Sequence, residues 1–153
     1  MNRTVFALPE QSTYATAGGL AVTRTAVPFA GGAALDRLIE WLDCRRGVML
    51  SSGTSVPGRY ESFDLGFADP PLRLESKGFD FFIDALNARG KVLVAFLGAT
   101  LNEPGVVVSE KTATRLTGHI VRGEAPVEEE RRTRRASIMS LVRVVVAALA
   151  APD

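Results

Sequence analysis

The fold prediction begins with residues 72–97, whose sequence reads LRLESKGFDFFIDALNARGKVLVAFL. Two short segments, 72–76 and 79–86, flank Lys77-Gly78 and are predicted to be strands. The next four residues, 87–90 (NARG), have the composition of a hairpin turn that places Gly90 in the left-handed conformation. Residues 91–97 are then predicted to be an apolar return strand. This stretch therefore predicts three consecutive strands of an antiparallel sheet.

Alternating apolar and polar residues predict further strands on both sides of this stretch. In residues 60–68 the apolar set includes Phe63, Leu65 and Phe67, and the Asp-Pro-Pro run at 69–71 ends the strand. Other segments predicted as strands are residues 20–27, 48–50, 106–108 and 112–121.

Two segments have the helical period instead. Residues 33–43 place Leu35, Leu38 and Leu42 on one apolar face. A longer helix is predicted to begin near Pro126, with glutamates in its first turns and ion pairs between Glu128 and Arg132 and between Glu130 and Arg134. From Ile138 this helix is apolar nearly all round, so it must be covered, either by the sheet already present or by another part of a longer protein.

Together these patterns predict an α+β fold. We expect a mostly antiparallel sheet of about seven strands with one short and one long helix.

The composition limits which classes of function are plausible. The chain has 153 residues, of which 46% are hydrophobic and 23% charged, and these fractions are typical of a soluble domain. Its formal net charge of +1 indicates no nucleic-acid partner. The longest apolar run, residues 138–151, is shorter than the roughly 20 residues of a membrane span. With no secretory signal visible, we expect a cytoplasmic chain with no membrane partner.

Few residues are candidates for chemistry. The single cysteine, Cys44, excludes a disulfide within the chain and a cysteine-rich zinc site. Any histidine-based mechanism would rest entirely on the single histidine, His119, which is interpreted as a surface or hydrogen-bonded residue and not as a general base. Arg45 and Arg46 could activate Cys44, but an ordinary thiol is favoured. The basic run at 131–135 is interpreted as a solvated helix face because three glutamates precede it. No catalytic or phosphate-binding motif is present, so the pattern alone predicts no catalytic residue, no cofactor and no metal ligand.

Residues 51–53 (SSG) form a different kind of candidate, because two serines end an apolar strand before a loop. Strand ends followed by loops often form small-ligand sites, although a capped strand end is the simpler interpretation.

Five segments of the chain form a recognisable set: GGLAVTRTAVPF (18–29), ALDRLIEWLDCRRGVMLSSG (34–53), PGRYESFDLGFADPPL (57–72), DALNARGKVLV (84–94) and EEERRTRRASIMSLVRVVVAAL (128–149). Through these segments the chain resembles the N-terminal region of anthranilate synthase component I, in the bacterial form that is fused to a glutamine amidotransferase. Residues 43–71 are the most specific part of the resemblance.

The resemblance implies an activity that this chain would serve without performing it. The family converts chorismate and glutamine to anthranilate, pyruvate and glutamate, with Mg²⁺ in the active site, and so begins tryptophan biosynthesis. Its catalytic and metal-binding residues lie in a chorismate-binding domain. Residues 1–153 would then be an N-terminal domain only, with the chorismate-binding and glutamine amidotransferase portions absent. Those portions would be its partners.

The resemblance also implies a site for feedback by L-tryptophan. The family motif reads Leu-Leu-Glu-Ser, and the matching positions place Leu50, Ser51 and Ser52 in the tryptophan-binding segment, with Arg59-Tyr60 as the pair that follows. Ser51 stands where the family usually has a glutamate. A serine hydroxyl is a weaker partner than a carboxylate for the ammonium group of an amino acid.

Two other functions remain open at this point. The chain could be the N-terminal segment of another chorismate-using synthase, of the phenazine or aminodeoxychorismate type. It could also be a stand-alone assembly module that docks a separate catalytic chain through residues 138–149.

Overall fold

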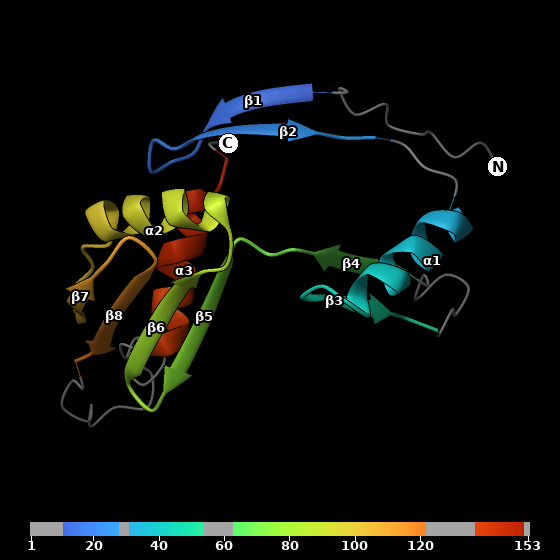
Figure 1. Cartoon of the computed structure of the whole chain (residues 1–153). Helices are drawn as coiled ribbons and strands as arrows, with labels where there is room; N and C mark the ends of the chain where they lie inside the picture. Colours follow the sequence, from blue (N-terminus) through green and yellow to red (C-terminus); the bar gives the residue numbers. More distant parts are fainter. Residues whose placement is uncertain (1–10, 28–30, 54–62, 122–136, 152–153) are drawn as a thin grey trace, which may run out of the picture. The chain divides into compact units, whose positions relative to one another are not determined.

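The computed structural model describes residues 11–27, 31–53, 63–121 and 137–151 (Figure 1). The chain divides into two compact units. One contains Met1–Val27 and Leu72–Asp153, and the other contains Pro28–Pro71.

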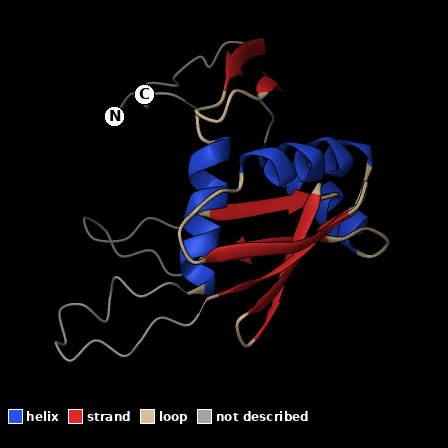
Figure 2. Ribbon diagram, turned by 90° about the vertical axis from the view of Figure 1, so that its left-hand side faces the viewer, coloured by secondary structure: helices blue, strands red, loops and turns tan. Residues whose placement is uncertain are grey.

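The first unit is built on a four-stranded antiparallel sheet. Its strands are β5 (Leu72–Lys77), β6 (Asp80–Ala85), β7 (Val106–Lys111) and β8 (Arg115–Ile120), in the order β5-β6-β8-β7. Two helices, α2 (Ala88–Thr100) and α3 (Ile138–Leu149), accompany this sheet (Figure 2).

The core lies between the sheet and these two helices. Successive side chains of a strand point to opposite faces, so Phe81 and Ile83 of β6 and Leu116 and Ile120 of β8 point inward together. The helices contribute Val94, Leu97 and Leu141, which are at most 1% exposed. Glycine is required at position 118 of β8, because a Cβ there would collide with the carbonyl oxygen of Val107 and lie 2.5 Å from Phe81 Cζ.

Helix α2 corrects the prediction of a hairpin turn and a return strand at residues 87–97. Asn87 is the N-cap, with extended backbone (φ −156°, ψ −173°), and its side chain accepts a hydrogen bond of 3.1 Å from the Gly90 N–H. Gly90, Val94 and Leu97 are buried at helical spacing. A short, nearly continuous apolar run does not distinguish a strand from a helix, and an asparagine suits a turn as well as a helix cap.

Helix α3 begins later than predicted. Ser137 is extended (φ −147°, ψ 169°), and it caps the helix through reciprocal hydrogen bonds with Ser140. A continuous helix through residue 137 is therefore wrong. The predicted start at Pro126 and the pairs Glu128–Arg132 and Glu130–Arg134 lie outside the described residues.

One face of α3 is covered by its own unit. Leu141 is fully buried, and Ile138, Val144 and Val145 pack against the same core. The opposite face carries two exposed apolar side chains, since Met139 is 59% and Val146 60% exposed. The sequence analysis allowed two kinds of cover for this helix. The sheet of the same unit is one of them, and it covers at least one face of α3.

A hairpin of β1 (Gln11–Ala15) and β2 (Ala21–Thr25) completes the first unit. Its turn donates hydrogen bonds to the end of α3, from Ala17 N–H to the Ala150 oxygen (3.0 Å) and from Gly18 N–H to the Ala148 oxygen (3.2 Å). The last carbonyls of a helix have no partner within the helix, so the turn supplies the missing donors. Strand β1 was not predicted, because its sequence, QSTYA, is mostly polar.

The second unit consists of helix α1 (Gly31–Leu42) and a two-stranded antiparallel sheet of β3 (Gly47–Ser51) and β4 (Asp64–Ala68). The helix lies close against two glycines of the sheet. A Cβ at Gly47 would lie 2.5 Å from Leu42 Cδ2, and a Cβ at Gly66 would collide with Leu38 Cδ2. Glycines on this face let the helix approach the strands closely.

The predicted α+β class and the antiparallel pairing are confirmed, whereas the single sheet is wrong. The described residues contain three helices and eight strands, and these strands form sheets of two, two and four strands. Within the described residues, none of the helices has the length and apolar character needed to span a membrane.

Candidate functional site

The three residues of the candidate tryptophan-binding segment lie at the end of β3. Leu50 is paired with Leu65, and Ser51 with Asp64. The pairing continues one step beyond the strand, because the Ser52 N–H donates to the Phe63 carbonyl oxygen at 2.9 Å.

The alternation of the strand divides these residues between two faces. Ser51 shares a face with Gly47, against which α1 packs, whereas Leu50 and Ser52 belong to the opposite face. Leu50 is 54% exposed, and Ser52 is half-buried. An apolar side chain and a hydroxyl therefore lie side by side, a combination that suits an amphipathic small molecule. Arg59 and Tyr60 lie outside the described residues.

A set of large apolar side chains surrounds Leu50 on this side of the sheet. We call it the β3–β4 apolar face. Its residues come from both strands and from the position just before β4, and their exposed fractions run from 37% to 60%: Val48, Leu50, Phe63, Leu65 and Phe67. The alternation of apolar residues in 60–68 predicts that one face of this strand is apolar. It does not predict which of the two faces α1 covers.

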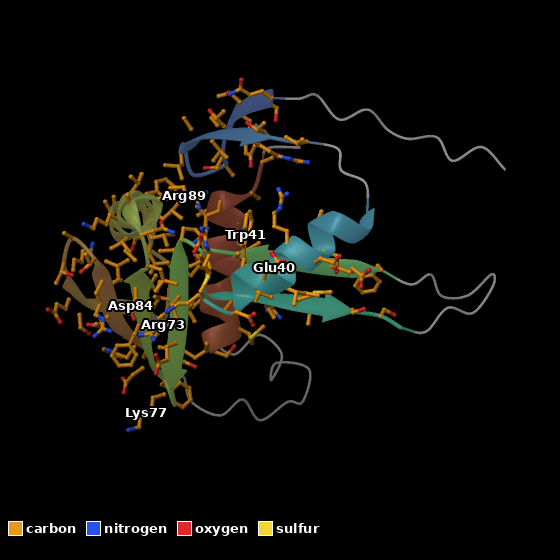
Figure 3. All side chains as sticks on the ribbon, turned by 45° about the vertical axis from the view of Figure 1, so that its right-hand side comes forward. Glu40, Trp41, Arg73, Lys77, Asp84 and Arg89 are labelled. Atoms are coloured by element: carbon orange, nitrogen blue, oxygen red, sulfur yellow. The ribbon has the colours of Figure 1, made fainter. Side chains whose placement is uncertain are left out.

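A charged cluster that the sequence analysis did not single out lies on the four-stranded sheet, on the face opposite the core. Asp84 of β6 accepts from Arg73 of β5 at 2.8 Å and from Arg115 of β8 at 2.5 Å. Figure 3 labels Arg73 and Asp84 on these neighbouring strands. Part of this cluster could have been predicted from the sequence, because a hairpin around Lys77-Gly78 places Arg73 directly opposite Asp84.

The two arginines determine the protonation of this carboxyl group. Hydrogen bonds from Arg115 and Arg73 outweigh the cost of desolvation and lower the pKa of Asp84 from 3.8 to about 2. In return, Asp84 raises the pKa of Arg115. The Arg115 guanidinium also lies 5.8 Å from the centre of the Phe82 ring. Asp84, Arg73 and Arg115 each have an oppositely charged partner within the cluster. We therefore interpret the cluster as a structural ion-pair network that joins strands β5, β6 and β8.

The remaining candidates for chemistry stay apart from one another. His119 of β8 is exposed and is paired in register with Asp80 on one side and Val107 on the other. Cys44 is an exposed thiol. Its neighbour Arg45 bonds to Asp69 at 2.7 Å and lies over the Trp41 ring. The basic run at 131–135 lies outside the described residues.

Known proteins provide one informative comparison. A curated protein named anthranilate synthase, from Azospirillum brasilense, is 40% identical to this chain over 147 residues, which is 95% of this chain. The resemblance to anthranilate synthase is thereby confirmed. The chain spans 20% of the length of this anthranilate synthase. No family model matches the chain, and no solved structure matches it.

Proposed function

We propose that this chain is the N-terminal region of an anthranilate synthase component I. In the enzyme it has a structural role and forms part of the site at which tryptophan exerts feedback inhibition. The observation that carries the proposal is the 40% identity over 95% of the chain to a protein named anthranilate synthase. Because the match covers only 20% of that relative, the chemistry is assigned to the remaining portions of the enzyme.

In this proposal the chain does not catalyse alone. Chorismate, glutamine and Mg²⁺ are bound by the chorismate-binding and glutamine amidotransferase portions. Where the structure describes the chain, no three His, Cys, Asp or Glu side chains are grouped to hold a metal ion. In this proposal Mg²⁺ belongs to the chorismate-binding portion.

The feedback role rests on the end of β3. Leu50 offers apolar contact to an indole ring, and the Ser52 hydroxyl, on the same face of β3, offers a hydrogen bond to the amino-acid end of tryptophan. The resemblance also assigns Ser51 to the site, and its side chain belongs to the opposite face of the strand. A hydroxyl at position 51 binds an ammonium group less strongly than a carboxylate would. We therefore expect the isolated chain to bind L-tryptophan weakly or not at all.

The test uses a chimaera in which this chain replaces the matching region of the Azospirillum brasilense anthranilate synthase. We expect the chimaera to form anthranilate and to be inhibited by L-tryptophan. Ser52→Ala should raise the tryptophan concentration at half-inhibition about tenfold, since it removes one hydrogen-bonding group from the site. Ser109→Ala, at an exposed position of β7, is the matched control and should keep the original sensitivity.

Different results separate the parts of this proposal. A chimaera that makes no anthranilate would contradict the assignment to component I. An active chimaera whose inhibition is unaffected by Ser52→Ala would contradict only the feedback role. A micromolar calorimetric isotherm for L-tryptophan with the isolated chain, lost in Ser52→Ala, would make the chain a self-sufficient sensor.

The exposed β3–β4 apolar face also suits the alternative of a stand-alone assembly module. The intact mass of the native product distinguishes the two. A product several times heavier than 16.4 kDa agrees with a segment of a synthase, and a 16.4 kDa product agrees with a module.

A further inference from the structure

The register of β3 and β4 places a carboxylate beside the candidate tryptophan-binding segment. Ser51 of β3 is paired directly with Asp64 of β4. Residues directly opposite each other in an antiparallel pair point to the same face of the sheet, with their Cβ atoms about 4.5–5.5 Å apart. The Asp64 side chain therefore lies beside that of Ser51, which stands where the family usually has a glutamate.

The hydrogen bonds at this end of the sheet bring the two side chains close together. The Ser52 N–H donates to the Phe63 carbonyl oxygen at 2.9 Å, so Ser52 and Phe63 form a hydrogen-bonded pair. Such pairs alternate along an antiparallel ladder, which makes Ser51 and Asp64 a non-hydrogen-bonded pair. Side chains approach each other most closely in pairs of this second kind. A carboxylate on β4 can thus occupy the space that a glutamate at position 51 would fill.

The charges around this pair favour one carboxylate and not two. Like charges directly opposite each other in a sheet are destabilising, so a glutamate at position 51 would repel Asp64. The next residues on the same face are Met49 of β3 and Gly66 of β4, which carry no charge. None of the ion pairs among the described residues includes Asp64. The pair therefore carries one negative charge that is available to a cation.

We infer that Asp64 supplies the carboxylate that binds the ammonium group of L-tryptophan in the feedback site, in place of a glutamate at position 51. This inference rests on the proposed function and adds a residue to the site. The Ser51 hydroxyl, directly opposite, accepts a second hydrogen bond from the same ammonium group. Gly53, which follows Ser52, has no side chain, so an amino acid at the end of β3 can reach both Asp64 and the Ser52 hydroxyl.

The test compares two inhibitors of the chimaera described above, which supplies the portions of the enzyme that the isolated chain lacks. L-Tryptophan has the ammonium group, whereas indole-3-propionate has the same ring and carboxylate without it. Asp64→Asn should raise the L-tryptophan concentration at half-inhibition about tenfold to a hundredfold, since it removes a charged hydrogen-bonding partner. It should not weaken inhibition by indole-3-propionate. Asp43→Asn, the same change at an exposed position before the other end of β3, is the matched control and should keep the original sensitivity.

A second set of variants moves the carboxylate across the pair. Asp64→Ser should weaken inhibition by L-tryptophan as Asp64→Asn does. Adding Ser51→Glu to Asp64→Ser should restore most of the sensitivity, because the carboxylate then reaches the same space from β3. Circular dichroism checks that each variant folds. Should the Asp64 variants fail to fold, the unaltered chimaera provides the comparison: L-tryptophan should inhibit it at a concentration about tenfold lower than indole-3-propionate, and equal inhibition would overturn the inference.

The outcomes separate this inference from the proposed function. Unchanged sensitivity of Asp64→Asn to L-tryptophan would overturn the inference and leave the proposed function standing. An equal loss of inhibition by both compounds would also overturn it, since Asp64 would then have a structural role only. A chimaera that forms no anthranilate, or one that L-tryptophan does not inhibit, would instead overturn the proposed function, and this inference with it.

Discussion

Asp84 holds three strands together through one carboxylate. Its side chain is only 13% exposed and lies between two arginines, one from β5 and one from β8. Removing one partner of a partly buried charge costs more than removing an exposed ion pair, because the remaining charges lose their compensation.

The lowered pKa of Asp84 predicts how stability depends on pH. The carboxylate is favoured in the folded state, so its contribution is complete above the unfolded value of about 4 and is lost as the pH falls through about 2. Asp84→Asn should therefore lower the free energy of unfolding by about 1–2 kcal/mol at pH 7, since part of the shift is screened by solvent.

Urea unfolding from pH 7 down to pH 2 checks this prediction. The difference between wild type and Asp84→Asn should shrink between about pH 4 and about pH 2. Asp80→Asn, on the same strand but exposed, should change stability by less than about 0.5 kcal/mol. A difference that is constant with pH would mean that the carboxylate charge does not contribute.

Helix α2 depends on the cap that the sequence analysis assigned to a turn. The Asn87 side chain accepts from the Gly90 N–H, one of the donors that a helix leaves unpaired at its start. Asn87→Ala should lower the free energy of unfolding by about 1 kcal/mol. Asn87→Asp should retain most of the stability, because it keeps the acceptor and adds a negative charge at a helix N-terminus.

Equilibrium unfolding in urea, followed by circular dichroism, measures both variants. Equal losses for Asn87→Ala and Asn87→Asp would show that the cap is not what stabilises the helix.

The sequence patterns predicted some elements well and others poorly, for physical reasons. Helix α1 and strands β4, β5 and β6 follow from a clear apolar period. Residues 91–97 do not reveal their helix, because Val92, Val94 and Phe96 have strong strand propensity and the helix forms through packing of Val94 and Leu97 against the sheet. The division of Leu50 and Ser51 between two faces follows from alternation, but which face α1 covers depends on tertiary packing.

The whole molecule contains two units with very different interiors. The single tryptophan, Trp41, lies in the second unit, so its fluorescence reports on that unit alone. Because none of its side chains in residues 34–53 and 63–71 is fully buried, the second unit should unfold at a lower denaturant concentration than the first.

Comparing two probes in one urea titration tests this expectation. The midpoint from Trp41 fluorescence should lie below the midpoint from circular dichroism, which reports on both units. Gly66→Val should move mainly the fluorescence midpoint, since it forces the Leu38 contact apart. Coincident midpoints would mean that the two units unfold as one.

The contact between the first hairpin and the last helix bears on how the protein is made. Gly18 leaves the ribosome early, yet its hydrogen-bond acceptor at Ala148 is synthesised 130 residues later (148 − 18). At roughly 5–20 residues per second, that interval lasts several seconds or more. Residues 28–71 emerge during this wait and contain all of the second unit, so the unit with the weaker interior is complete while the stronger one still lacks its final helix.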